Sequence, residues 1–380
     1  MASVAADPVL ILGGGLMGLS IAHALACRGE AVLVLSRRRG EAAGFVAAGM
    51  LAPHAEGLQG PLLALGQASL ALIPRWVDQL EADSGLACGL RATGIVVPFA
   101  NAAERDAFPT AAWGEPLERD ALEREVPGLA PRWRSGLLFH ADGQIDNRRR
   151  LMRALERACV QRGVAFEEGA EVRELLQRGG RLEAVRLRGA DGEERELAAD
   201  QAVLCSGAWS GHLVPALPVF PVKGQMLSLQ APRQALARVL FGPGTYLVPR
   251  QDGLVVVGAT SEPEAGFAEG LTPAGQRQLE AGLAGLLPEA ALWPPMERWW
   301  GFRPCTPDEG PLLGKGPLEG LWLCTGHHRN GVLLAGISAA LVATDLDGAT
   351  GGGEAEAERG DASEAAALLA AFAWTRFGSP

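Results

Sequence analysis

Val9-Leu10-Ile11-Leu12 runs directly into Gly13-Gly14-Gly15-Leu16-Met17-Gly18 near the start of the chain. An apolar strand that opens into a G-x-G-x-x-G turn and then a helix is the fingerprint of a dinucleotide-binding unit. Gly13 permits the tight turn, Gly15 lets the backbone approach a pyrophosphate, and Gly18 lets the helix pack closely on its strand. The N–H groups at the helix start then face the anion, so a dinucleotide site is predicted without any charged side chain.

The flanking residues complete a βαβ unit and extend it along the chain. Apolar residues recur at helical spacing from 16 to 28, and residues 31–35 have the composition of a buried parallel strand. Further buried strands are predicted at 201–205 and 321–324, with β-rich sequence between them. This order predicts an α/β fold, α+β in part, in which a Rossmann-like nucleotide-binding domain is interlaced with a β-rich substrate-binding domain.

Both domains are therefore expected to be discontinuous in sequence. We assign residues 1–75, 145–217 and 300–349 to the nucleotide-binding domain, and residues 76–144 and 218–299 to the substrate-binding domain. The Gly-rich stretch 350–364, with its alternating Glu and Ala, predicts a disordered linker. Residues 365–380 are predicted to form a C-terminal helix.

Bulk composition narrows the functional classes. The chain has 380 residues and a net charge of −10, which argues against nucleic acid or an anionic membrane as a partner. No run of residues approaches a transmembrane span and no basic leader precedes Val9, so the cytoplasm is expected. The six cysteines form no C-x-x-C pair, and His327-His328 lacks a Cys or carboxylate partner, so no metal site is predicted.

The residues that follow the predicted strand 31–35 indicate which dinucleotide binds. Ser36 stands where an acidic residue usually binds the adenosine ribose, and Arg37-Arg38-Arg39 follows it. These arginines could bind the 2′-phosphate of NADP or form a solvated loop. Residues 44–56 are small, mostly apolar and glycine-containing, which suits a loop packed against a flat ring and favours FAD.

Residues 44–56 closely resemble the glycine oxidase branch of the D-amino-acid oxidase family of FAD enzymes, the branch that serves thiamine biosynthesis. The resemblance covers most of the chain and recurs at 206–210, 221–225, 246–250, 257–260, 300–304 and 326–331. It implies an oxidase that converts glycine or another small amine to its imino acid. Hydride would pass to flavin N5, and O2 would be reduced to H2O2. It also implies a homo-oligomer and non-covalent FAD, because Cys305 is displaced from the position of covalent flavin attachment in related sarcosine oxidases.

The first loop and this resemblance together define a set of expected site residues. The cofactor-binding set is Gly13, Gly15, Leu16, Met17, Gly18, Ser36, Arg37, Ala43, Gly44, Ala47, Ala48, Gly49, Met50, Val172, Ser206, Gly207, Trp209, His327, His328, Arg329, Asn330, Gly331, Val332 and Leu333. Arg303 is expected to grip the substrate carboxylate, with Tyr246 and Arg329 close by and Met50 either in the pocket wall or in packing. The other interpretations are a structural ion pair for Arg303 and a core position for Tyr246.

Two alternatives to glycine oxidation stay open. Gly244 and Ser261 occupy places where the family can carry larger pocket side chains, so the substrate could be sarcosine or a small D-amino acid, and the enzyme an oxidase or a dehydrogenase. A protein of another class, a dinucleotide-binding sensor without turnover, would need no carboxylate clamp.

Overall fold

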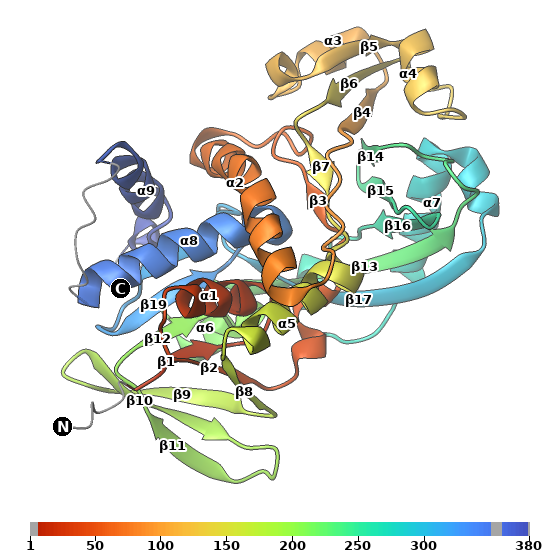
Figure 1. The fold of residues 1–380 in the computed structure, drawn as a ribbon. Coiled ribbons are helices and arrows are strands. Elements are labelled where there is room, and N and C mark those ends of the chain that lie inside the picture. The colour runs from red at the N-terminus through yellow and green to blue at the C-terminus, as the bar shows by residue number, and fades with distance from the viewer. Residues whose placement is uncertain (1–6, 351–358, 379–380) are drawn as a thin grey trace.

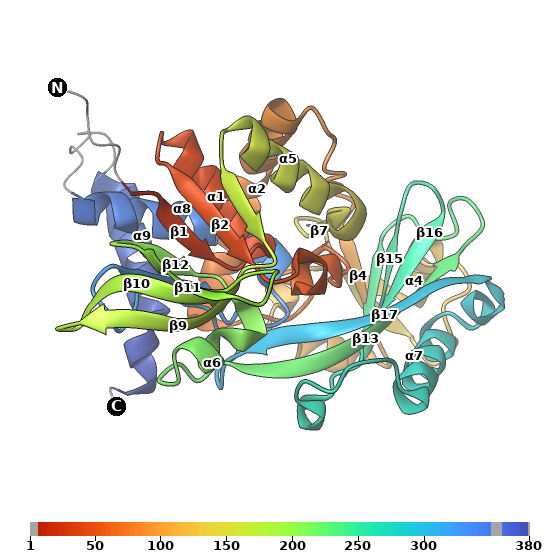
Figure 2. The ribbon, with the colours of Figure 1, turned by 90° about the horizontal axis from the view of Figure 1, so that it is seen from below.

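The structure is a computed structural model, which describes residues 7–350 and 359–378. Two large sheets lie at opposite ends of the molecule, and long paired strands extend from the second sheet toward the first (Figures 1 and 2). The first sheet has the order β18 (Leu312–Lys315), β19 (Leu321–Thr325), β12 (Ala202–Leu204), β1 (Val9–Leu12), β2 (Val32–Ser36) and β8 (Ala165–Glu168). All neighbours in it are parallel except β18 and β19.

This six-stranded sheet is the middle layer of three, because its strands are apolar on both faces. In β1, Val9 and Ile11 face a helical layer, whereas Leu10 and Leu12 face a small antiparallel sheet. The helical layer consists of α1 (Leu16–Cys27), α2 (Gly60–Ser84), α5 (Met152–Gln161) and α8 (Gly331–Thr350). The small sheet is made of β9 (Glu171–Arg178), β10 (Arg181–Arg188) and β11 (Glu194–Ala198).

The second large sheet is mostly antiparallel. Its order is β17 (Pro295–Cys305), β13 (Phe220–Gln230), β16 (Leu254–Gly258), β15 (Thr245–Pro249), β14 (Val239–Gly242), β4 (Ile95–Phe99), β6 (Ser135–Phe139) and β5 (Glu115–Glu118). Leu247 and Val257 face α7 (Pro273–Leu286), whereas Val248 and Val256 pack toward the segment 48–55. The second sheet therefore packs against the segment 48–55, which follows β2 of the first sheet in the chain.

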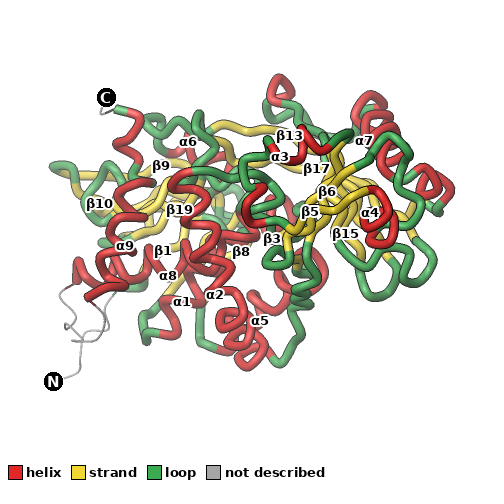
Figure 3. Tube along the Cα trace, turned by 90° about the horizontal axis from the view of Figure 1, so that it is seen from above, coloured by secondary structure: helices red, strands yellow, loops and turns green. Residues whose placement is uncertain are grey.

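Shorter elements complete the chain, and Figure 3 shows the helical layer at one end and the second sheet at the other. These elements are β3 (Met50–Leu51) paired with β7 (Gly143–Gln144), and the helices α3 (Ala102–Asp106), α4 (Arg119–Glu125), α6 (Ser210–Leu213) and α9 (Arg359–Ala371). The strands and helices predicted at 9–12, 16–28, 31–35, 201–205 and 321–324 are confirmed within one or two residues at their ends.

The predicted boundaries need two corrections. A domain boundary at residue 75 falls inside α2, whose residues from Leu65 to Leu80 pack in the same core as α1 and α8. A linker over 350–364 is also too long, because α9 begins at Arg359 and ends at Ala371. Residues 351–358 of that linker lie outside the described residues. The division into two interlaced domains itself stays a prediction.

Helix α8 corrects the expectation that no segment approaches a membrane span. Within the described residues, Gly331–Gly348 alone is long and apolar enough to qualify, with a mean hydropathy of 1.4. However, 61% of this segment is buried inside the protein, where α8 packs against α1 and α2. Its burial is that of a central core helix surrounded by other elements.

Candidate cofactor and substrate site

A cavity of about 390 Å³ opens where the carboxyl ends of the parallel strands meet the second sheet. The loops that follow β1, β2, β12 and β19 contribute to its wall at one end. Strands β13, β15 and β17 contribute side chains at the other end. Ligands of open α/β sheets bind at this edge, where loops from neighbouring strands diverge.

The glycine loop forms the phosphate end of the cavity. Gly13 has φ +125°, and a Cβ added there would lie 2.5 Å from the carbonyl oxygen of Cys205. Helix α1 begins behind Gly15 without a side-chain cap and without an acidic residue in its first turn. Its first N–H groups are therefore free of competing side chains and suit an anionic ligand.

The three arginines after β2 are paired with carboxylates. Arg37 and Arg38 lie 2.7 Å and 2.8 Å from the two oxygens of Glu41. Arg39 lies 2.7 Å from Glu168. A 2′-phosphate needs uncompensated positive charge, so this arrangement favours a dinucleotide without that phosphate.

The loop 43–49 forms the wall beside the glycine loop, and side chains from elsewhere hold its carbonyl groups. Asn147 Nδ2 donates to the carbonyl of Gly44 at 2.5 Å and to that of Ala47 at 3.2 Å. The buried guanidinium of Arg250 donates to the carbonyl of Ala48. These contacts fix a main-chain surface of small residues against which a flat ring can pack.

Arg303 lies at the other end of the cavity, on β17 opposite Val222 of β13. Its Nη1 donates to the carbonyl of Thr260 at 3.1 Å. Among the described residues, no carboxylate lies within ion-pairing distance of this guanidinium. A Cβ on Gly224 would overlap the guanidinium, so that glycine is needed for Arg303 to lie flat against β13. The structural ion pair considered for Arg303 is therefore not present.

Arg329 and Glu56 form the adjacent charged pair in the same cavity. Arg329 Nη2 lies 2.9 Å from Glu56 Oε2, and the Glu56 side chain is only 8% exposed. Burial raises the pKa of Glu56, although Arg329 and Arg303 act to lower it. Glu56 was absent from the predicted site, although it is the one acidic residue in the segment 44–56.

Tyr246 projects from β15 into the cavity beside these groups. Its hydroxyl lies 3.7 Å from Met226 Sδ, and its ring lies over Gly258 on the neighbouring strand. Burial raises the pKa of Tyr246, although Arg303 and Arg329 act to lower it. The hydroxyl therefore stays protonated and can donate a hydrogen bond.

Most of the predicted site residues do line this one cavity. These are Gly13, Gly15, Leu16, Met17, Ser36, Arg37, Ala43, Gly44, Ala47, Ala48, Gly49, Met50, Val172, Ser206, Gly207, Trp209, Tyr246, Arg303, His327, His328, Arg329, Gly331 and Val332.

Gly18, Asn330 and Leu333 do not line the cavity. A Cβ on Gly18 would overlap the carbonyl oxygen of Gly13, so this glycine supports the loop from behind. Leu333 is buried in the helical core, and its carbonyl accepts a 2.5 Å hydrogen bond from Ser69. Gly331 and Val332 at the start of α8 thus line the cavity, whereas Asn330 and Leu333 on either side of them do not.

His327, His328 and Cys305 do not indicate further chemistry in the cavity. His327 Nε2 contacts Ser338 Oγ at 3.0 Å. Burial, with help from Arg303 and Arg329, lowers the pKa of His328 to about 4. Cys305 is buried and outside the cavity lining, and burial raises the pKa of its thiol to about 12, which does not suit flavin attachment.

These residues fit the expected FAD. A pyrophosphate would be held by the uncapped start of α1, a ribose by Ser36, and the ring by the loop 43–50 and the start of α8. The tight turn of this loop depends on Gly13, where a side chain would collide with the Cys205 carbonyl.

Comparisons with known proteins agree with this arrangement. Residues 8–344 match the family described as DAO, FAD dependent oxidoreductase. The bifunctional protein ThiO/ThiG of Synechocystis sp. is 43% identical over 88% of this chain and 50% of its own length, so the chain spans about half of that relative. The glycine oxidase of Pseudomonas aeruginosa is 33% identical over 90% of this chain and 95% of its own.

A solved structure of glycine oxidase from Geobacillus kaustophilus has a TM-score of 0.81 and 30% identity. It covers 89% of this chain and 93% of its own. The predicted FAD-binding fold is confirmed by this likeness. The chain therefore belongs to the DAO family of FAD-dependent oxidoreductases, and FAD is its cofactor.

Proposed function

We propose that this protein oxidises glycine, or a similarly small amino acid, to the imino acid and passes the electrons to O2, which becomes H2O2. The observation that supports this most is the guanidinium of Arg303, which faces the cavity without a carboxylate partner among the described residues. A planar guanidinium binds a carboxylate through two hydrogen bonds and fixes both its position and its rotation.

The neighbouring residues complete the binding of a small zwitterion. Tyr246 donates a neutral hydrogen bond to the same carboxylate, since its hydroxyl is protonated. Arg329, held by Glu56, adds positive charge at the cavity wall. FAD, when bound, supplies the acceptor for the hydride removed from the α-carbon.

The protein supplies orientation rather than acid–base chemistry in this mechanism. Neither buried His–Asp pair of the described residues lines the cavity, since His54–Asp142 and His23–Asp83 both lie elsewhere. A substrate that enters with a neutral amine needs no protein base, and a fixed orientation can by itself provide a large rate enhancement.

Substrate size is the open variable of this proposal. Gly244 and Ser261 do not line the cavity, and a Cβ on Gly244 would meet nothing within 4 Å. Because neither residue narrows the cavity, sarcosine and D-alanine are the substrates to compare with glycine.

The roles outside the cavity come from the resemblance and from the relatives. The imino product would be delivered to thiazole formation in thiamine biosynthesis, as implied for the glycine oxidase branch. We also expect a cytoplasmic homo-oligomer that does not bind nucleic acid or membranes, consistent with the net charge of −10. Size-exclusion chromatography with light scattering tests the oligomer.

The decisive experiment is anaerobic mixing of the yellow holoenzyme with glycine, sarcosine and D-alanine. We expect the flavin absorption to bleach with glycine and to return with H2O2 release when O2 is admitted. Bleaching by sarcosine or D-alanine alone would reassign the substrate, and bleaching without peroxide release would indicate a dehydrogenase. A flavin that no amine in a broad panel reduces would favour the sensor and contradict the proposal.

A further inference from the structure

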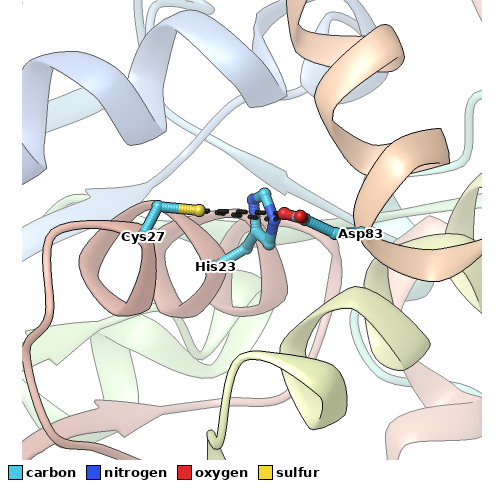
Figure 4. A group of neighbouring side chains, drawn as sticks. All are labelled: His23, Cys27 and Asp83. Carbon is cyan, nitrogen blue, oxygen red and sulfur yellow. Dashed lines mark hydrogen bonds and ion pairs between the residues drawn. The ribbon is translucent and has the colours of Figure 1, made fainter.

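Three side chains with metal-binding atoms meet outside the cavity (Figure 4). His23 and Cys27 lie one turn apart on α1, and Asp83 is in the last turn of α2. His23 Nε2 lies 2.7 Å from Asp83 Oδ2 and 3.6 Å from Cys27 Sγ, and Cys27 Sγ lies 3.9 Å from Asp83 Oδ2. All three donor atoms lie within 4.8 Å of one another.

The arrangement does not suit a Cys-His-Asp catalytic triad. A triad needs one ring nitrogen for the nucleophile and the other for the carboxylate. Here the same atom, His23 Nε2, contacts both Cys27 and Asp83. Three donor atoms this close together can instead share one metal ion, if the ion replaces the hydrogen bond between His23 and Asp83.

One of the three donor pairs already has the spacing of a tetrahedral zinc centre, whereas His23 Nε2 and Asp83 Oδ2, now hydrogen-bonded at 2.7 Å, would have to separate to about 3.3 Å to bind the same ion. Zn–S and Zn–N bonds of about 2.3 Å and about 2.0 Å place S and N about 3.5 Å apart at a tetrahedral angle. The observed distance between Cys27 Sγ and His23 Nε2 is 3.6 Å. We propose that His23, Cys27 and Asp83 form a Zn²⁺ site with a fourth position open to water on the exposed side of Cys27.

The local electrostatics favour a cation at this point. Cys27 is the last residue of α1, Asp83 lies in the last turn of α2, and α5 ends at Gln161 beside them. The C-terminal end of a helix carries partial negative charge, so three such ends attract positive charge. Arg28 does not fill the position, because its guanidinium is bound to Thr344 and Asp347 on α8.

Arg162 is the competing cation. Its Nη2 lies 2.5 Å from Asp83 Oδ1 and its Nε lies 3.0 Å from Asp83 Oδ2. Zinc would use the remaining lone pair of Oδ2, which His23 now contacts, and Arg162 would keep Oδ1. Removal of Arg162 should therefore strengthen zinc binding, which an ion-pair network without a metal does not predict.

Charge and protons balance at such a site. Zn²⁺ is neutralised by the Cys27 thiolate and the Asp83 carboxylate, and His23 binds as neutral imidazole with its proton on Nδ1. One proton leaves the Cys27 thiol for solvent. The ion would join the ends of α1 and α2, so its expected effect is on the stability of the helical layer rather than on turnover.

The test is zinc titration of the FAD-loaded protein after chelator treatment. We expect one Zn²⁺ per chain by calorimetry and a rise in Tm. Binding should weaken by about tenfold or more in Cys27→Ser and Asp83→Asn. It should tighten by roughly tenfold in Arg162→Gln, because one nearby positive charge is removed.

Cobalt gives a second readout that does not depend on stability. Co²⁺ should produce a thiolate-to-metal charge-transfer band that Cys27→Ser abolishes. His140→Gln is the matched control, since His140 pairs with Glu115 on an exposed surface and should leave zinc binding unchanged.

The proposal is overturned if neither the wild type nor Arg162→Gln binds zinc. It is also overturned if zinc binds equally well to Cys27→Ser, or if cobalt shows no thiolate band. Because these readouts do not use amine oxidation, they are independent of the proposed function.

Discussion

The two ends of the cavity treat arginine in opposite ways. At the nucleotide end, Arg37, Arg38 and Arg39 are each paired with a nearby carboxylate, and the uncapped start of α1 is left to bind the anion. At the substrate end, Arg303 has no carboxylate partner among the described residues, and Arg329 pairs with a buried one. Within the cavity, the guanidinium without a carboxylate partner therefore lies at the end where we propose that the substrate carboxylate binds.

Replacing Arg303 should break the substrate end most severely. In Arg303→Met the clamp is lost, and we expect kcat/KM for glycine to fall by roughly 100- to 1000-fold, with FAD retained. Steady-state peroxide formation measures kcat/KM, and the flavin spectrum measures the retention of FAD. Arg38→Met is the control, because the Arg38 side chain is 73% exposed and pairs with Glu41. Equal kinetics in the two variants would remove Arg303 from the site.

At the nucleotide end, by contrast, we expect a substitution that displaces the main chain to be disruptive. In Gly18→Ala the new Cβ overlaps the Gly13 carbonyl, and the loop must shift. We expect a loss of about 1–3 kcal/mol in unfolding free energy and incomplete retention of FAD. Gly40→Ala, where an added Cβ meets nothing within 4 Å, should keep both close to wild type. Chemical denaturation measures the unfolding free energy of the two variants, and the flavin-to-protein absorbance ratio measures how much FAD each retains.

Glu56 should show opposite effects on stability and activity. Its pKa is raised in the folded state, so ionised Glu56 is a penalty to the folded protein, which loses stability as the pH rises through that raised value. Glu56→Gln removes the penalty and should stabilise by up to about 1 kcal/mol. It also releases Arg329, and kcat/KM should fall by about tenfold. A variant that loses both stability and activity, or that loses neither, would contradict the role given to Glu56. Glu41→Gln serves as the control at the nucleotide end.

The smallest effect concerns His328, which faces Arg303, Arg329 and, at 3.6 Å, the exposed Glu309. Its pKa is about 4 in the folded protein and 6.5 ordinarily, so the unfolded chain takes up the proton first. The contribution of neutral His328 is present above pH 6.5 and is lost as the pH falls toward 4. His328→Gln should reduce the loss of unfolding free energy over this interval by about 1 kcal/mol. A slope identical to that of wild type would show that His328 does not titrate in this way.

Much of the nucleotide end could be predicted from the sequence alone. The strand, the glycine turn and the helix lie within residues 9–27, and each is recognised by local spacing. The substrate end was reached only through the family resemblance, since Tyr246, Arg303 and Arg329 are widely separated in sequence. Glu56 was missed because a single carboxylate in a loop has no pattern until its partner is known.

The same limit explains the errors. The boundary at residue 75 failed because α2 continues to Ser84, and only its packing against α1 and α8 shows where it belongs. Helix α8 has the composition of a membrane span, and only its burial identifies it as a core helix. The cluster of His23, Cys27 and Asp83 was invisible because no short motif joins α1 to the end of α2.

By itself, the order of residues determined the dinucleotide unit, the alternation of parallel strands with helices, and the choice of a flavin loop. These depend on neighbours a few residues apart, whose backbone preferences and apolar periodicity act locally. Only the tertiary structure decided which arginines are neutralised, which carboxylate is buried, and which side chains share a cavity. Charge pairing and burial depend on distances through space, and in this chain those distances join residues that folding alone brings together.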